Sequence, residues 1–178
     1  MSERWKFGLQ FYFQTIARLM WAPRRFFSDL SHEVGFLRSL GVLIVSSLFF
    51  GGAGIMNDTS ENPLIKGGIF FTNAISMTFL AAGIGYMVMT MMLGRCVTFT
   101  KLFSVYALSS GVTLLASWIP FFVWLTEPWK WWLIGTGMTR YCGLQLKHAV
   151  TIIGITVCVL LLFFWSLLPV ISSLKSIN

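Results

Sequence analysis

The sequence predicts an all-α integral membrane protein, with five transmembrane helices in a bundle and an N-terminal amphipathic helix lying in the membrane interface. Of the 178 residues, 56% are hydrophobic and only 11% are charged, and the mean hydropathy is +0.77. These values lie far outside the range of soluble globular domains. A succession of long apolar runs gives the number of helices, because about 20 apolar residues cross the hydrocarbon core of a bilayer.

Residues 1–36 are predicted to lie on the membrane surface rather than to cross it. Residues 5–21, WKFGLQFYFQTIARLMW, are rich in aromatic side chains. A polar side chain recurs at every fourth position of this stretch, at Lys6, Gln10, Gln14 and Arg18. This spacing gathers polar residues on one helix face and leaves an apolar face for the acyl chains. Pro23 is expected to end that helix, because proline fits only the first turn of a helix.

Arg24 and Arg25 form the densest basic cluster of the chain, directly before Phe26 and Phe27. Cationic side chains of this length reach lipid phosphates while neighbouring aromatic rings bury in the membrane. The cluster is therefore either an orientation signal without a partner, or a contact site for an anionic lipid or a protein.

Five apolar segments follow within residues 37–178, which form one transmembrane domain. They cover residues 37–56, 69–93, 102–119, 129–143 and 149–168. Pro120 is expected to end the third helix and Pro169 the fifth. The fourth segment is short for a complete crossing, so residues 119–143 remain open between a full span, an interfacial turn and an extension of the third helix.

Lysine and arginine residues are distributed unevenly between the two sides of such a five-span chain. The N-terminal side carries ten of the thirteen, whereas the six acidic residues divide equally. By the positive-inside rule, the N-terminus is cytoplasmic and the C-terminus is outside. The ten are Arg4, Lys6, Arg18, Arg24, Arg25, Arg38, Arg95, Lys101, Arg140 and Lys147, and the other three are Lys66, Lys130 and Lys175.

Six basic residues near the expected cytoplasmic ends of the helices are candidates for contact with an anionic lipid headgroup or a partner. The alternative is that each side chain anchors separately in the interface. The six are Arg24, Arg25, Arg95, Lys101, Arg140 and Lys147.

Three pairs of small residues, each four positions apart, predict close approach between helices. Such pairs let helix backbones pack tightly in a membrane, either within one chain or across a homodimer. The pairs are Ala81 with Gly85, Ala107 with Gly111, and Gly135 with Thr139.

The sequence argues against catalysis and against ion-coupled transport. No charged residue falls in the middle of a predicted span, where coupled transporters usually need one. His32 and His148 lack a neighbouring nucleophile or ligand pattern, and Glu127 and Asp58 are expected in loops without a paired carboxylate. We therefore expect no catalytic residue, no metal site, no cofactor and no nucleic-acid partner.

Three stretches carry a family resemblance through their order along the chain. They are APRRFFSDL ahead of the spans, LFSVYALSSGVTLLASWIP in the third span, and WWLIGTGMTRYCGLQLKHAVTII from the fourth span to the fifth. Together they resemble the Yip family of Rab-interacting five-span membrane proteins, in a bacterial-type form, over roughly residues 18–168. The resemblance implies a five-span bundle of the inner membrane with a cytoplasmic N-terminus and a tendency to oligomerise. A bacterial member would have no Rab partner.

These observations predict a non-catalytic membrane organiser or scaffold that binds lipids, itself or other membrane proteins. The alternative is a small lipid or solute carrier, or a membrane subunit of a transport complex. A carrier would have a cavity open to one face, with Arg95, Arg140 or Lys147 pointing into it. A scaffold would have a closed bundle with an exposed face of small residues.

Overall fold

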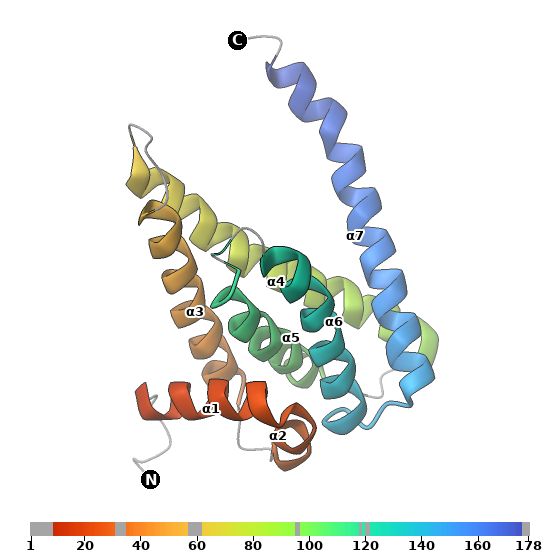
Figure 1. Cartoon of the computed structure of the whole chain (residues 1–178). Coiled ribbons are helices and arrows are strands. Elements are labelled where there is room, and N and C mark those ends of the chain that lie inside the picture. Colours follow the sequence, from red (N-terminus) through yellow and green to blue (C-terminus); the bar gives the residue numbers. More distant parts are fainter. Residues whose placement is uncertain are drawn as a thin grey trace.

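A computed structural model of the chain describes residues 9–30, 35–56, 62–94, 97–117, 119 and 122–175 (Figure 1). Within these ranges the regular secondary structure is helical throughout, as the composition predicts. The helices are α1 (Leu9–Trp21), α2 (Pro23–Asp29), α3 (Phe36–Met56), α4 (Pro63–Leu93), α5 (Phe99–Leu114), α6 (Val123–Arg140) and α7 (Leu146–Lys175).

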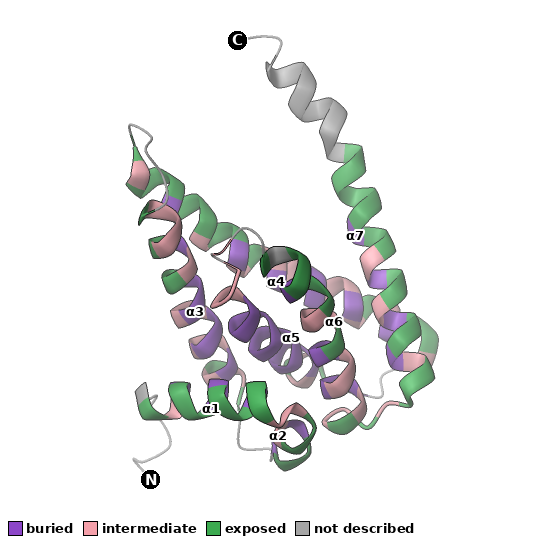
Figure 2. Cartoon of the chain, viewed as in Figure 1, coloured by how far each residue is buried: buried purple, intermediate pink, exposed green. Residues whose placement is uncertain are grey.

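Helix α5 forms the centre of the bundle. Residues 102–113 of this helix are all buried, and twelve consecutive residues make more than three helical turns, so protein covers every side of the helix. Figure 2 shows α5 as a continuous buried segment with α3, α4 and α6 around it. The hydrophobic core of the protein is therefore organised around one short helix.

An aromatic cluster joins three helices near the start of α5. The ring centroid of Phe103 lies 4.8 Å from that of Phe36 on α3 and 4.5 Å from that of Phe79 on α4. Phe99 adds a third ring at 6.0 Å. Ring pairs at these separations stabilise a core beyond the area that they bury. The cluster fixes α3 and α4 against α5 at the end of the bundle where α1 and α2 lie.

Helix α6 differs from the expected fourth segment. It begins at Val123 and ends at Arg140, whereas the apolar run predicted residues 129–143. Pro128 lies inside the helix, and Glu127 is helical rather than part of a loop, which corrects the expectation. Because Pro128 is near the helix start, its missing N–H removes a hydrogen bond only at the beginning of the ladder.

The other helix ends also differ from the expected segments. Helix α4 begins at Pro63, six residues before the expected start, because proline is favoured at the first position of a helix. Helix α5 ends at Leu114, and the following turn is closed by the N–H of Ser117, which donates to the carbonyl of Thr113. Pro120 lies outside the described residues. Helix α7 continues through Pro169 to Lys175, so the prediction that Pro169 ends it was wrong; membrane helices tolerate proline because neighbouring groups satisfy the freed carbonyl.

Three of the described helices are long and apolar enough to cross a bilayer: α3, α4 and residues 146–166 of α7. Helix α5 has 16 residues, fewer than the ~20 that a spanning helix needs. Helix α6 carries Glu127, Lys130 and Arg140 within its 18 residues. Length and composition therefore identify a helical membrane protein with three candidate spans among the described residues, and they do not confirm five.

Candidate functional site

Helix α1 lies across one end of the bundle and divides its side chains among three environments (Figure 1). Tyr12, Ile16 and Leu19 are buried in the protein core. Phe13 is 65% exposed and Trp21 90% exposed, on a different side of the helix. The polar residues predicted to share a stripe, Gln10, Gln14 and Arg18, are also exposed, and Lys6 lies outside the described residues.

This arrangement corrects the expected role of the apolar face. The sequence predicted that the face lies against acyl chains, but half of it packs on the protein. Tyr12 and Ser46 share a hydrogen bond that joins α1 to α3. Phe27 of α2 is fully buried beside Gly137 of α6. Helices α1 and α2 are therefore parts of the bundle, and hydropathy alone does not distinguish burial in protein from burial in lipid.

A groove of about 450 Å³ runs between α1 and α2. Arg18 and Arg25 line it from the two helices, and Asp29 contributes one carboxylate. Both arginine side chains are exposed. The remaining lining residues are Phe11, Gln14, Thr15, Ala22, Phe26 and Leu30. The groove thus combines two guanidinium groups, uncharged polar groups and aromatic rings, which suits an anionic headgroup with its attached apolar chain.

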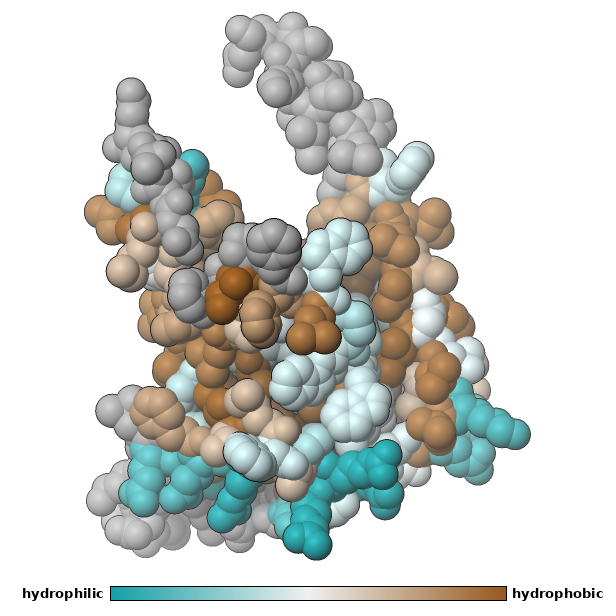
Figure 3. All heavy atoms as spheres, viewed as in Figure 1, coloured by the Kyte–Doolittle hydropathy of each residue, from teal (hydrophilic) through white to brown (hydrophobic). Residues whose placement is uncertain are grey.

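The predicted cationic residues lie at the same end of the molecule, where Figure 3 shows hydrophilic side chains gathered beneath the apolar bundle. Arg24, Arg140 and Lys147 are exposed there. Lys101 is partly buried, and its ammonium lies 6.0 Å from the ring centre of Tyr141. Arg95 lies outside the described residues. We call this end, formed by α1, α2, the starts of α5 and α7 and the end of α6, the basic face.

Arg25 is the one residue of the six predicted contact residues that lines the groove among those the structure describes. The second arginine of the groove, Arg18, was predicted only as part of the polar stripe of α1. A ring of cations around one pocket is therefore not seen among the described residues. The signal that could have found the groove is the spacing of Arg18 and Arg25 on the two sides of Pro23.

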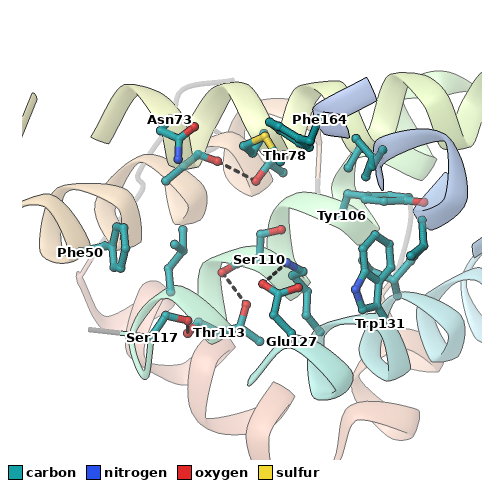
Figure 4. A pocket seen from close by; sticks show the side chains of 18 of the residues that line it. Phe50, Asn73, Thr78, Tyr106, Ser110, Thr113, Ser117, Glu127, Trp131 and Phe164 are labelled. Atoms are coloured by element: carbon teal, nitrogen blue, oxygen red, sulfur yellow. Dashed lines mark hydrogen bonds and ion pairs between the residues drawn. The ribbon is translucent and has the colours of Figure 1, made fainter. Parts of the chain in front are cut away.

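A second cavity, of about 440 Å³, lies between α4, α5, α6 and α7, away from the basic face (Figure 4). Its lining is apolar with a row of polar groups. The polar members are Asn73, Thr78, Tyr106, Ser110, Thr113, Ser117, Glu127 and Lys130. We call this cavity the cleft. Sequence reasoning did not find it, because its polar residues come from three helices and each helix contributes only a few.

An ion pair within α6 lies at the cleft. Lys130 Nζ is 2.6 Å from Glu127 Oε1, and the two residues are three apart on α6. The Lys130 side chain is 22% exposed and that of Glu127 is 53% exposed. The three-residue spacing of Glu127 and Lys130 could have predicted this ion pair, since residues three apart on a helix are neighbours. The sequence analysis missed the pair because it placed Glu127 in a loop.

The predicted small residues lie at contacts between helices of the chain. A Cβ added at Gly111 would lie 3.1 Å from Val42 of α3, and one at Gly135 would lie 3.3 Å from Ile153 of α7. Gly85 faces the hydroxyl of Tyr106. In the three predicted pairs, the residues four positions from these glycines are Ala81, Ala107 and Thr139. Ala81 and Ala107 are buried, and the hydroxyl of Thr139 donates to the carbonyl of Thr136.

Cys142 follows α6 at the basic face and carries a free thiol. Burial raises the pKa of this thiol to about 12, against the opposing effect of Lys101. A thiol with so high a pKa is unreactive at neutral pH, because the thiolate is the nucleophile and the metal ligand. In the described part of the chain, His, Cys, Asp and Glu side chains do not gather in groups of three or more that would hold a metal ion.

The apolar helix bundle, the amphipathic helix α1 across its end and the basic face together define a helical integral membrane protein. The sequence matches the Yip1 domain over residues 17–168, and the chain therefore belongs to the Yip1 domain family. Comparison with curated proteins and with solved structures gives no significant match.

Proposed function

We propose that this protein is a non-catalytic membrane organiser that holds anionic lipid headgroups at its basic face and associates with itself or with other membrane proteins. The groove between α1 and α2 is the observation that carries this proposal. Arg18 and Arg25 present planar guanidinium groups, which bind phosphate oxygens through two parallel hydrogen bonds.

The surroundings of the groove support a position at the membrane surface. Phe13 and Trp21 are exposed beside it, and aromatic side chains of this kind favour the headgroup level of a bilayer. Because α1 and α2 pack on the bundle, the backbone positions of Arg18 and Arg25 on the two sides of the groove are fixed before a lipid binds. Such preorganisation lowers the entropy lost on binding.

The orientation follows from the same charges. The basic face would be cytoplasmic by the positive-inside rule, with the C-terminus on the other side of a bacterial inner membrane. Residues 161–165 of α7 are exposed and apolar, so this helix offers surface to lipid or to a second membrane protein. This surface is where we would seek a homo-oligomeric contact.

The proposal is tested by anionic lipid binding to the full chain. The protein is purified in a mild detergent, and its affinity for fluorescent phosphatidylglycerol is compared with that for phosphatidylcholine. Arg18→Gln with Arg25→Gln should weaken phosphatidylglycerol binding at least tenfold, because each cation at a surface contributes about 1 kcal/mol toward anionic lipid.

The matched control is Arg140→Gln with Lys147→Gln, which removes two charges from the same face outside the groove. This control should weaken binding much less. If the two double variants lose the same affinity for phosphatidylglycerol, binding depends on the overall positive charge of the basic face and not on the groove. No preference for phosphatidylglycerol in the unmodified protein would overturn the organiser proposal as stated.

The cleft favours a second candidate, a small lipid or solute carrier or a membrane subunit of a transport complex. The expected carrier has a cavity lined by Arg95, Arg140 or Lys147, but Glu127 and Lys130 provide the charges instead. A carrier would move a labelled lipid across proteoliposomes faster than lipid-only vesicles do. Measuring the rate of lipid transfer in reconstituted vesicles separates this candidate from a static organiser.

A further inference from the structure

Three hydroxyl groups of the cleft donate their protons to backbone carbonyls. Thr78 Oγ1 donates to the carbonyl of Ala74 at 3.0 Å, and Ser117 Oγ donates to that of Thr113 at 2.8 Å. Thr113 Oγ1 donates to its own helix as well, to the carbonyl of Ser109 at 3.2 Å. A hydroxyl has one proton, so these three oxygens offer only acceptor sites to a molecule in the cleft. Ser117 Oγ has one such site left, because Thr126 Oγ1 lies 3.2 Å from it and occupies the other.

The charged pair adds an anionic acceptor and a cationic donor at the same place. The Glu127 carboxylate extends the acceptor set, because it lines the same cleft as the hydroxyl groups of Ser110 and Thr113 (Figure 4). The ammonium of Lys130 has three N–H groups, and its contact with Glu127 uses one of them. The cleft therefore calls for a ligand with several N–H or O–H donors and one anionic group.

We propose that the cleft binds the headgroup of a phospholipid that carries both a phosphate and a primary ammonium, the phosphoethanolamine class. The ammonium donates to Glu127 and to the hydroxyl oxygens of Thr113 and Ser117, and the phosphate accepts from Lys130. A choline headgroup has no N–H to donate. An anionic headgroup places its charge near the Glu127 carboxylate with no ammonium to compensate for it.

The geometry of the cleft matches a lipid that stays in the bilayer. Its volume of about 440 Å³ lies within the range of small-molecule sites and accommodates a headgroup rather than acyl chains. Leu161 and Phe164 of α7 line the cleft and are exposed, so its rim continues into apolar surface. The acyl chains would lie along this surface in the leaflet away from the basic face. The inference goes beyond the proposed function, and it stands whether or not the bound lipid is moved.

The test compares three short-chain phospholipids by isothermal titration calorimetry in detergent. It uses the full chain with Arg18→Gln and Arg25→Gln, so that phosphatidylglycerol bound at the groove does not contribute. Phosphatidylethanolamine should bind about tenfold more tightly than phosphatidylcholine or phosphatidylglycerol at this site. Glu127→Gln should lower the phosphatidylethanolamine affinity about tenfold. Thr72→Val is the control, because Thr72 is exposed on α4 and lines neither the cleft nor the groove, and it should leave the affinity unchanged.

Thr113→Val keeps the shape of the side chain and both charges, and it removes one acceptor. It should reduce the preference for phosphatidylethanolamine over phosphatidylcholine, and it keeps the proposal testable if Glu127→Gln fails to fold. Equal affinities for the three lipids, or unchanged affinity in both variants, would overturn the inference. Arg18→Gln with Arg25→Gln should leave phosphatidylethanolamine binding intact, so failure here is distinguishable from failure at the groove.

Discussion

The hydroxyl oxygen of Tyr12 lies 2.9 Å from Ser46 Oγ, so a residue of the interfacial helix α1 is hydrogen-bonded to the middle of α3. Both side chains are buried. Burial raises the pKa of Tyr12, which keeps its hydroxyl protonated and able to donate. This bond fixes the height and rotation of α1 against the bundle, and with them the position of Arg18 in the groove.

Tyr12→Phe should destabilise the protein by about 1 kcal/mol, the usual net contribution of a buried hydrogen bond. The effect should be partly lost in a Ser46→Ala background, because the partner is already gone. Thermal unfolding in detergent, followed by circular dichroism, measures both. Full additivity of the two substitutions would contradict the bond between these two groups.

Gly137→Ala should destabilise the contact of α6 with α5 and α2. The added Cβ would clash with Val105 and would lie 3.0 Å from the ring of Phe27. Overpacking of this kind costs about 1–3 kcal/mol. Gly83→Ala is the control, since an added Cβ there meets nothing within 4 Å, and it should be neutral or stabilising. Comparable melting temperatures for the two variants would argue against the close packing at Gly137.

Cys142 should resist alkylation in the folded protein at pH 8. Its pKa of about 12 leaves almost no thiolate, whereas an unfolded cysteine, with a pKa of about 8.5, is partly ionised. In a chain with Cys96 and Cys158 replaced by serine, unfolding in sodium dodecyl sulfate should raise the alkylation rate at least tenfold. The rate in the folded state should rise continuously as the pH increases from 8 toward 12. A fast reaction of the native protein at pH 8 would contradict the raised pKa.

The number of crossings can be read from single cysteines placed in the connections between helices. Asn62, Thr98, Phe122 and Gln145 are exposed and directly precede helices. If α3 to α7 each cross the bilayer, Thr98→Cys and Gln145→Cys should react with an impermeant maleimide from one side. Asn62→Cys and Phe122→Cys should then react from the other side. If only α3, α4 and α7 cross, Phe122→Cys reacts instead from the side of Thr98→Cys, and that result would contradict five crossings.

The helical segments of this chain could be predicted because apolar runs and polar interruptions are local features of sequence. Gln10, Gln14 and Arg18 were placed correctly on the exposed side of α1 for that reason. The burial of Tyr12 could not be predicted, because hydropathy gives the same score to a side chain in protein and one in lipid. Its partner Ser46 is 34 residues away and is itself unremarkable in sequence.

The cleft could not be predicted for a related reason. Thr78, Thr113 and Lys130 come together from α4, α5 and α6, and their meeting depends on helix packing rather than on any local pattern. Glu127 was misplaced because it precedes the apolar run expected at residues 129–143, whereas the helix begins at Val123. Local rules give the elements, and the site depends on contacts between distant parts of the chain.

The enclosure of α5 has a consequence for how the protein is made. Each segment leaves the ribosome in order, and a helix is retained in the bilayer when its side chains favour lipid over water. Helix α5 carries four serine and threonine residues among its buried positions, including Ser104 and Thr113, and its surroundings in the finished protein are other helices. We expect α3 and α4 to be inserted first and to receive α5 together with α6 as a pair, so that biogenesis depends on neighbours already in place.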